Sequence, residues 1–315
     1  MNVRIVFMGT PDFGVPVLES LVRSHHDVVA VYTRPDRPSG RGRRLAPSPV
    51  KQAAVSHGIA VIEPETLRGE SRVTELAGLC PDLVVVAAFA YLLPEELLRV
   101  PRLGCLNVHP SLLPRHRGPS PVASAILSGD DRTGVSIMLM DAGLDTGPVL
   151  SQEAAAISDS DTTGSLTAAL AELGARLLVE TIDGWLAGSA VPRVQNEREA
   201  TYSGKVGAED GLLDWTQPAT VLSRRVKAYN PWPGCHTFWE GQRLKVHSAV
   251  PLALRPHGEP GRVVQLPGPV PTRIGVVTAQ GVLGLGGIQL EGKREVAADE
   301  FIRGHRGFVG AMLGR

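Results

Sequence analysis

Short apolar runs alternate with amphipathic stretches through the first half of the chain. The first run is VRIVFMG at 3–9, which ends at a glycine, and the apolar residues between 17 and 22 then fall at helical spacing. Four more runs read as strands, at 27–33, 58–62, 82–89 and 106–108. Strands that are apolar on both faces and separated by helices are typical of the parallel sheet of an α/β domain.

A second pattern follows these strands. Residues 133–141 and 148–156 read as a further pair of strands. Residues 162–186 carry leucines at four-three-four spacing, which predicts an amphipathic helix. These elements together predict a Rossmann-like domain with a mostly parallel sheet over residues 1–188.

The chain changes character after this helix. Residues 189–206 are polar, contain a proline and keep no sustained period, which predicts a linker. A helix is expected at 218–228, and five strand-like runs follow at 235–240, 243–250, 261–266, 273–279 and 281–290. Their spacing predicts a small β-barrel of the oligonucleotide-binding (OB-like) type over 207–315, and a sandwich of similar size would give the same pattern.

Composition narrows the class of protein. Hydrophobic residues make up 43% and charged residues 20% of the chain, as in soluble globular proteins. The longest apolar run, at 83–93, is far shorter than the roughly 20 residues that a membrane helix needs, so no membrane partner is expected. The three cysteines are an odd number without metal-type spacing, which favours a reduced, cytoplasmic setting and no metal.

Charge is balanced overall but unevenly distributed. The formal net charge is zero, which argues against a protein that coats nucleic acid by bulk electrostatics. Residues 34–51 nevertheless hold six basic residues against one acid, and from Lys205 onward there are 14 basic and 9 acidic residues. The segment 34–51 could be a solvated, disordered loop. Its arginine density favours contacts with phosphates and base edges, to which guanidinium groups are suited.

Candidate chemistry gathers where the strand at 106–108 ends. Strand alternation places Asn107 and His109 on the same face, at the carboxyl end of a parallel strand, where α/β sheets bind ligands. An amide donor beside an imidazole can stabilise an oxyanion while a proton moves. Each residue could equally satisfy nearby backbone groups. His116, in the charged segment RHRG, is expected at the surface.

Two aspartates follow in MDAGLDTG, at 140–147. A carboxylate from Asp141 or Asp145 near His109 would orient the ring and favour its protonated form. Both aspartates could instead cap backbone amides in a turn, which is their usual role beside glycine. Cys105 shares the face of His109, but a small buried thiol is more typical of a core than of a nucleophile.

Two common motifs are excluded. The segment MGTPDFG after the first strand is not the GxGxxG fingerprint of dinucleotide-binding proteins. The segment SLLP around Ser111 is not the GxSxG elbow of hydrolases.

Three segments taken together resemble the tetrahydrofolate-dependent formyltransferases: MGTPDFGVPVLESL, NVHPSLLPRHRGPSP and MDAGLDTG. The Asn-x-His, SLLP and Asp-Thr-Gly elements are specific when they occur in this order. The resemblance extends to TRPDRPSGRG, PSPVK and KAYNPWPG and covers most of the chain, with 250–290 the least typical region. Within the family it points to the members that formylate methionyl initiator tRNA.

The resemblance implies roles for particular residues. Asn107, His109 and Asp145 would be catalytic, with Asn107 and a protonated His109 stabilising the charge on the formyl oxygen and Asp145 keeping His109 charged. The folate pocket would be lined by Ser111, Leu112, Leu113 and Pro114. The tRNA contacts would come from Arg41, Arg43 and Arg44, and from the C-terminal barrel.

The resemblance also implies substrates and setting. The formyl donor would be 10-formyltetrahydrofolate, the acceptor the methionine α-amine on initiator methionyl-tRNA, and no metal would take part. A cytoplasmic monomer is expected. Two alternatives stay open: a formyltransferase that acts on a small amine, such as a nucleotide-sugar or ribonucleotide amine, and a non-catalytic RNA-binding protein on the same scaffold.

Overall fold

The structure, a computed structural model, describes residues 2–39, 44–254, 258–268 and 271–314. It divides into two compact units. The first consists of Met1–Pro121, Asp131–Ala156 and Leu166–Ser203, and the second of Val122–Asp130, Ile157–Ser165 and Gly204–Arg315. Among the described helices, none combines the length and the apolar composition that crossing a bilayer requires.

The first unit is built on a seven-stranded sheet in the order β5-β2-β1-β6-β7-β8-β9. Five strands are parallel: β1 (Arg4–Gly9), β2 (Asp27–Tyr32), β5 (Val61–Ile62), β6 (Leu83–Ala87) and β7 (Cys105–His109). Two antiparallel pairings add β8 (Arg132–Leu139) and β9 (Val149–Ala156) at one edge. The predicted Rossmann-like domain with a mostly parallel sheet is confirmed.

The strand order explains where a ligand can bind. From β1 the chain builds outward to β2 and β5, and it then returns to the other side of β1 with β6 and β7. This reversal leaves a crevice at the carboxyl ends of the strands, which is the usual ligand site of open α/β sheets. The residues after β6 and β7 therefore lie where the topology favours binding.

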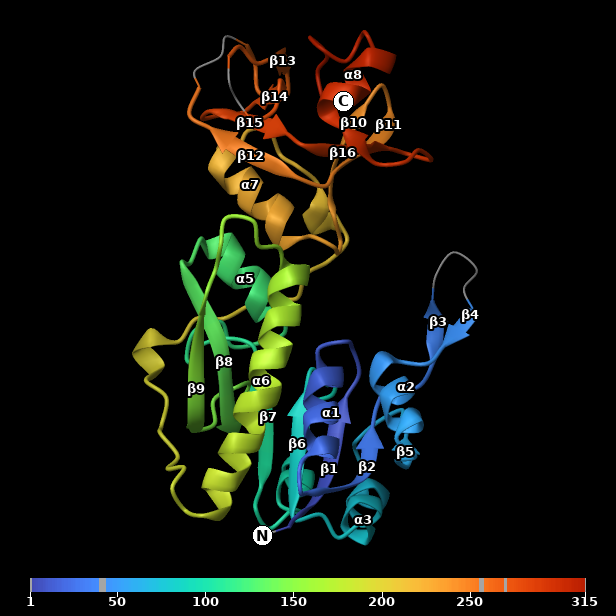
Figure 1. The fold of residues 1–315 in the computed structure, drawn as a ribbon, viewed down its shortest axis with the longest axis vertical. Helices are drawn as coiled ribbons and strands as arrows, with labels where there is room; N and C mark the ends of the chain where they lie inside the picture. The colour runs from blue at the N-terminus through green and yellow to red at the C-terminus, as the bar shows by residue number, and fades with distance from the viewer. Residues whose placement is uncertain (1, 40–43, 255–257, 269–270, 315) are drawn as a thin grey trace. The chain divides into compact units, whose positions relative to one another are not determined.

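Helices connect the strands and cover the sheet (Figure 1). They are α1 (Gly14–Arg23), α2 (Pro49–Ser56), α3 (Glu70–Gly78), α4 (Glu95–Leu98) and α6 (Thr163–Leu186). The predicted amphipathic helix is α6, and three of its four spaced leucines, Leu166, Leu170 and Leu177, are buried. At Gly174 this helix comes so close to β7 and β8 that an added Cβ would lie 2.7 Å from Val108.

The basic segment after β2 contains two short strands, β3 (Arg37–Ser39) and β4 (Arg44–Ala46), which pair antiparallel. Nothing in the apolar pattern predicts them, because a two-stranded ribbon needs no buried face to close its backbone hydrogen bonds. Ser48 then caps α2 by accepting a hydrogen bond from the Lys51 N–H at 3.1 Å.

The second unit contains antiparallel strands and the helices α7 (Ala219–Ala228) and α8 (Ala298–Gly304), and it includes α5 (Pro121–Ser128) except for Pro121. One sheet has the order β10-β11-β16-β17 and the other β12-β15-β14-β13. Their bounds are β10 (Cys235–Trp239), β11 (Gln242–Val246), β12 (Ala249–Leu252), β13 (Val263–Gln265), β14 (Ile274–Val277), β15 (Val282–Leu285), β16 (Gly287–Leu290) and β17 (Val296–Ala297). The predicted small antiparallel β-domain is confirmed.

Two of the five predicted runs each form two strands rather than one. The chain leaves β11 at His247-Ser248 and enters β12 of the other sheet, and it changes sheet again at Gly286, between β15 and β16. The Ser248 hydroxyl accepts a hydrogen bond from the Gly287 N–H at 2.7 Å, which ties the two crossings together. The sequence does not reveal such a change of sheet, because buried apolar residues lie on both sides of each break.

Gly174→Ala is expected to destabilise the protein, because the new methyl group would lie 2.7 Å from Val108 and 3.3 Å from Val135. Overpacking of this kind costs about 1–3 kcal/mol and lowers the Tm of thermal unfolding. Gly184→Ala, in the same helix, is the matched control, because its Cβ would approach no atom closer than 3.3 Å, the nearest being the Ser189 hydroxyl. Alanine favours a helix over glycine by about 1 kcal/mol, so Gly184→Ala keeps or raises Tm. Equal Tm values for the two variants would contradict the tight packing.

Candidate active site

Strand β7 carries the first two residues of the predicted site. Cys105, Asn107 and His109 alternate with Leu106 and Val108, which are buried, and β7 hydrogen-bonds with β6 on one side and β8 on the other. This pairing fixes the directions of Asn107 and His109. Asn107 is half-buried and His109 is buried.

Asp145 reaches both of these side chains. Asn107 Nδ2 donates to Asp145 Oδ1 at 3.3 Å, and His109 Nδ1 lies 3.7 Å from Asp145 Oδ2. The Gly118 N–H donates to Oδ2 at 2.7 Å and fixes the carboxylate from a third direction. Asp145 has a φ of +53°, a left-handed conformation that aspartate tolerates better than most residues and that recurs at functional sites. The three side chains therefore converge.

The other aspartate of the turn has a structural role. Asp141 Oδ1 accepts hydrogen bonds from the Gly143 N–H at 3.0 Å and from the Thr146 hydroxyl at 2.7 Å. Asp141 thus closes the turn that presents Asp145. The spacing alone left both roles open for both residues.

The burial of His109 favours the neutral form of its ring. Because a carbonyl oxygen can only accept, Nε2 carries the ring hydrogen and donates it to the His116 carbonyl at 3.1 Å. Burial lowers the pKa of His109 below its usual value, and the Asp145 carboxylate and the His116 carbonyl oppose that shift only in part. The protonated His109 that the family resemblance implies is disfavoured in the free protein, because desolvation of the ring outweighs the nearby carboxylate. Its bare Nδ1 faces Asp145.

Cys105 lacks the properties of a nucleophile. Its side chain is buried in an apolar cluster with Val84, Val86 and Leu97. Burial raises the pKa of its thiol to about 12, so the reactive thiolate does not form at neutral pH.

Side chains of β8 and β9 form hydrogen bonds with the backbone of the segment 111–114. Ser136 donates to the Ser111 carbonyl at 2.6 Å and accepts from the Leu113 N–H at 3.0 Å, and Gln152 donates to the Leu113 carbonyl at 2.7 Å. The side chains of Ser111 and Leu113 are buried, while Leu112 and Pro114 are half-buried. A ligand would therefore meet the backbone of this segment and the side chains of Leu112 and Pro114.

A buried arginine, which the sequence pattern did not reveal, supports the site. Arg117 has no exposed surface and donates to Gln195 Oε1 from Nε at 3.1 Å and from Nη2 at 2.9 Å. Gln195 in turn donates to the carbonyls of Asp145 at 2.8 Å and Gly147 at 2.7 Å. The network fixes the backbone of Asp145 from the segment after α6.

His116 is also buried, with an exposed fraction of 5%, which corrects the expectation that it lies at the surface. The charged residues of RHRG suggested exposure. The burial of His116 and Arg117 depends on the segment 193–203, which pairs with 114–118 through hydrogen bonds such as Arg117 N–H to the Thr201 carbonyl at 2.9 Å. Nothing local in the sequence indicates that pairing.

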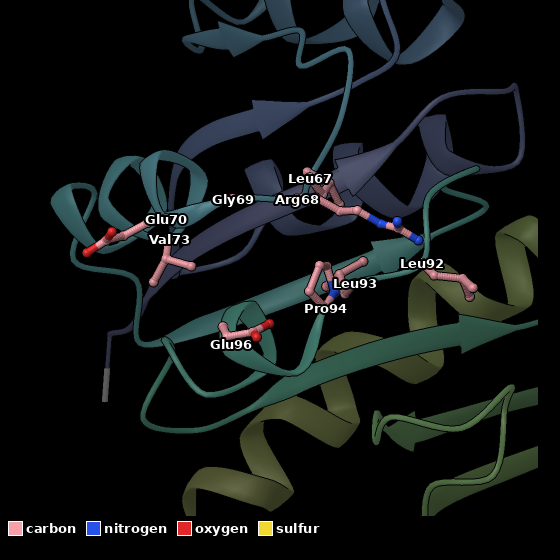
Figure 2. Close-up of a pocket in the computed structure, with 9 residues that line it drawn as sticks. All are labelled: Leu67, Arg68, Gly69, Glu70, Val73, Leu92, Leu93, Pro94 and Glu96. Atoms are coloured by element: carbon pink, nitrogen blue, oxygen red, sulfur yellow. The ribbon is translucent and has the colours of Figure 1, made fainter.

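A cavity of about 640 Å³ lies beside the segment that follows β6 (Figure 2). Leu92, Leu93 and Pro94 supply an apolar wall, and Leu67 and Val73 close another side. Figure 2 shows the Arg68 side chain extending toward Leu92, whereas Glu70 and Glu96 lie at the other end of the cavity. The cavity can thus take a molecule with an apolar body and an anionic group near Arg68.

Arg41 and Arg43, which were expected to contact nucleic acid, lie outside the described residues, and Arg44 is the first residue of β4. Another basic residue of this segment is already paired, since Lys51 Nζ lies 2.9 Å from Asp36 and 2.8 Å from Glu63. The pKa of Lys51 is raised by these carboxylates.

The geometry defines a chemical capability. An amide donor, a neutral imidazole and a carboxylate surround one point at the carboxyl end of β7. Such a set can stabilise negative charge on an oxygen and accept a proton from a nitrogen nucleophile, which is what transfer of an acyl group to an amine requires.

Family models match both parts of the chain. A model described as "Formyl transferase" matches residues 1–182, and one described as "Formyl transferase, C-terminal domain" matches residues 205–306. The chain belongs to the formyl transferase family.

Similar proteins narrow the class further. A protein from Methylococcus capsulatus named methionyl-tRNA formyltransferase is 45% identical over 311 residues, which cover 99% of each chain. A protein of the same name from Roseiflexus sp. (strain RS-1) is 46% identical over 317 residues, covering 100% of this chain and 96% of the relative.

Solved structures share the fold at low sequence identity. The sugar 3N-formyl transferase WlaRD has a TM-score of 0.65 and 15% identity, covering 93% of this chain and 99% of that one. HypX from Aquifex aeolicus, in complex with tetrahydrofolic acid, has a TM-score of 0.64 and 18% identity, covering 98% of this chain and 48% of that one.

The lowered pKa of His109 can be measured by NMR. The imidazole signals that disappear in a His109→Gln variant are expected to titrate with a midpoint below the ordinary value of about 6.5, because burial disfavours the charged ring. Asp145→Asn lowers the midpoint further, because it removes the carboxylate that favours the charge. A midpoint above the ordinary value, or one that rises in Asp145→Asn, would refute a neutral resting ring.

Gln195→Glu tests the support of Asp145. The new carboxylate keeps the acceptor for Arg117 but presents its second oxygen to the carbonyls of Asp145 and Gly147, which lose their donor. Unpaired buried groups cost about 1–3 kcal/mol, and a displaced Asp145 slows formyl transfer roughly 10- to 100-fold. Glu199→Gln is the control, because that side chain is exposed in the same segment and its hydrogen bond is with Asn196. Equal Tm and rate in the two variants would show that Gln195 does not position Asp145.

Proposed function

We propose that the protein transfers the formyl group of 10-formyltetrahydrofolate to the α-amine of methionine on initiator methionyl-tRNA, for the initiation of translation. The observation that carries the proposal is the convergence of Asn107, His109 and Asp145 at the carboxyl end of β7. The relatives, which match this chain over nearly its whole length, support methionyl-tRNA as the acceptor.

Asn107 stabilises the charge that develops in the reaction. The neutral amine attacks the formyl carbon, and negative charge forms on the formyl oxygen. Asn107 Nδ2 donates one hydrogen to Asp145, which orients the amide so that its second hydrogen can be donated to that oxygen. A donor in this position is worth about 3 kcal/mol of the activation barrier.

His109 and Asp145 transfer the proton of the attacking amine. The bare Nδ1 of the neutral ring accepts the proton that the attacking amine must lose. The resulting imidazolium lies beside the Asp145 carboxylate and the charged formyl oxygen, and both stabilise it. When the bond between the formyl carbon and folate N10 breaks, the proton passes to N10. The ring is therefore neutral before the reaction and charged only in the intermediate.

The donor is proposed to lie between the segment 111–114 and the cavity after β6. Leu112 and Pro114, with the backbone at Ser111 and Leu113, offer a wall for the flat pterin. The apolar side of the cavity and Arg68 suit the benzoyl group and the anionic tail of a folate. No step requires a metal.

The acceptor tRNA is proposed to contact the basic segment, through Arg41, Arg43 and Arg44, and the second unit. Residues 1–188 would act as the catalytic domain, 189–206 as the connection and 207–315 as the tRNA-binding domain. From Lys205 onward the chain has 14 basic and 9 acidic residues, and this surplus of positive charge supports a tRNA-binding role for the C-terminal region. An acceptor the size of a nucleotide-sugar would need neither region.

An acceptor assay tests the function directly. Initiator methionyl-tRNA, elongator methionyl-tRNA and a small aminosugar nucleotide are offered in parallel, with 10-formyltetrahydrofolate as donor. Formylation of the initiator tRNA is expected to be the fastest by a wide margin. Faster transfer to the small amine would replace the proposal by the alternative that WlaRD represents.

An Asn107→Ala variant separates catalysis from RNA binding. It is expected to lower kcat on the order of a hundred- to a thousandfold. Its Kd for the tRNA should stay unchanged, because Asn107 lies on the sheet of the first unit and not in the basic segment. Full activity of this variant would show that the trio is not the catalytic site.

A further inference from the structure

A second cluster, of two histidines and an aspartate, lies at the amino ends of the parallel strands, whereas Asn107 and His109 lie toward their carboxyl ends. His25 and His26 directly precede β2, at its amino end, and Asp183 lies in the last turn of α6. Because β2 runs parallel to β1, β6 and β7, the amino end of β2 and the carboxyl end of β7 lie at opposite ends of the parallel strands. The cluster is therefore separate from the proposed site of formyl transfer.

His26 is buried without the hydrogen bonds that a buried imidazole needs. Its side chain has no exposed surface, and within the described part of the chain neither Nδ1 nor Nε2 has a hydrogen-bond partner. Buried polar groups are nearly always satisfied, and leaving one unpaired costs stability. A ligand bound to one ring nitrogen of His26 would explain why that buried ring has no hydrogen-bond partner.

The distances within the cluster fit coordination better than hydrogen bonding. Asp183 Oδ1 lies 3.5 Å from His25 Nε2 and 3.6 Å from His26 Nε2. The ligating atoms of the three residues all lie within 4.8 Å of one another. These separations are long for hydrogen bonds. In a tetrahedral site with bonds of about 2.1 Å, two ligand atoms are roughly 3.4 Å apart, close to both observed values.

We propose that His25, His26 and Asp183 form a binding site for a divalent transition metal, with Zn²⁺ as the best match. Two imidazoles and one carboxylate suit Zn²⁺, whereas Mg²⁺ and Ca²⁺ prefer oxygen ligands alone. The exposed sides of His25 and Asp183 leave the remaining position to solvent. A bound metal would join the start of β2 to the end of α6 and stabilise the first unit.

The test is a metal titration of the full-length protein, with any affinity tag removed. Calorimetry with Zn²⁺ should show one site per chain, and Co²⁺ should give the visible absorption of a tetrahedral complex. Zn²⁺ should raise Tm. Asp183→Ala, at a half-exposed position that leaves the core intact, should weaken binding at least about tenfold and abolish the Tm increase.

Matched controls separate this site from ordinary surface binding. Glu180→Ala removes an exposed acid one turn earlier on α6, His57→Ala removes a partly exposed histidine elsewhere, and Cys80→Ser removes the exposed thiol. All three should bind Zn²⁺ like the unmodified chain. Binding that survives Asp183→Ala, or that is lost in any control, would overturn the assignment, as would the lack of a tetrahedral Co²⁺ spectrum. Asp183→Ala should retain formyl transfer.

Discussion

The geometry of the active site depends on the carboxylate of Asp145. Three groups contact it: the amide of Asn107 and the ring of His109, both on β7, and the backbone N–H of Gly118. Asp145 itself is held in a left-handed conformation by its turn and by Gln195, which binds the carbonyls of Asp145 and Gly147. The proposed catalysis by Asn107 and His109 would thus depend on a hydrogen-bond network that extends to the segment after α6.

Burial gives this carboxylate its chemical effect. A solvated histidine beside an aspartate would be charged before the reaction and could not accept a proton. At His109 desolvation dominates and favours the neutral ring, which in the proposed mechanism receives the proton of the amine. In that mechanism the carboxylate stabilises a charge that exists only during the reaction, which would lower the barrier without first lowering the energy of the bound ground state.

The sequence was informative where periodicity and topology suffice. Strand alternation places Asn107 and His109 on one face, and parallel strands fix the edge at which they lie. Alternation could not separate Asp145 from Asp141, because that choice depends on the turn hydrogen bonds. It also could not predict the burial of His116 and Arg117, since the acceptor of Arg117 lies 78 positions along the chain. The changes of sheet at Ser248 and Gly286 were not predicted either, because buried apolar residues continue on both sides of each.

A double-mutant cycle on kcat tests most directly whether Asp145 acts through His109. In the unmodified background, Asp145→Asn should slow formyl transfer by about a hundredfold or more, as expected for loss of general acid–base catalysis. In a His109→Ala background the same change should cost far less, because no imidazolium remains for the carboxylate to stabilise. Independent, multiplicative losses in the two backgrounds would contradict the account.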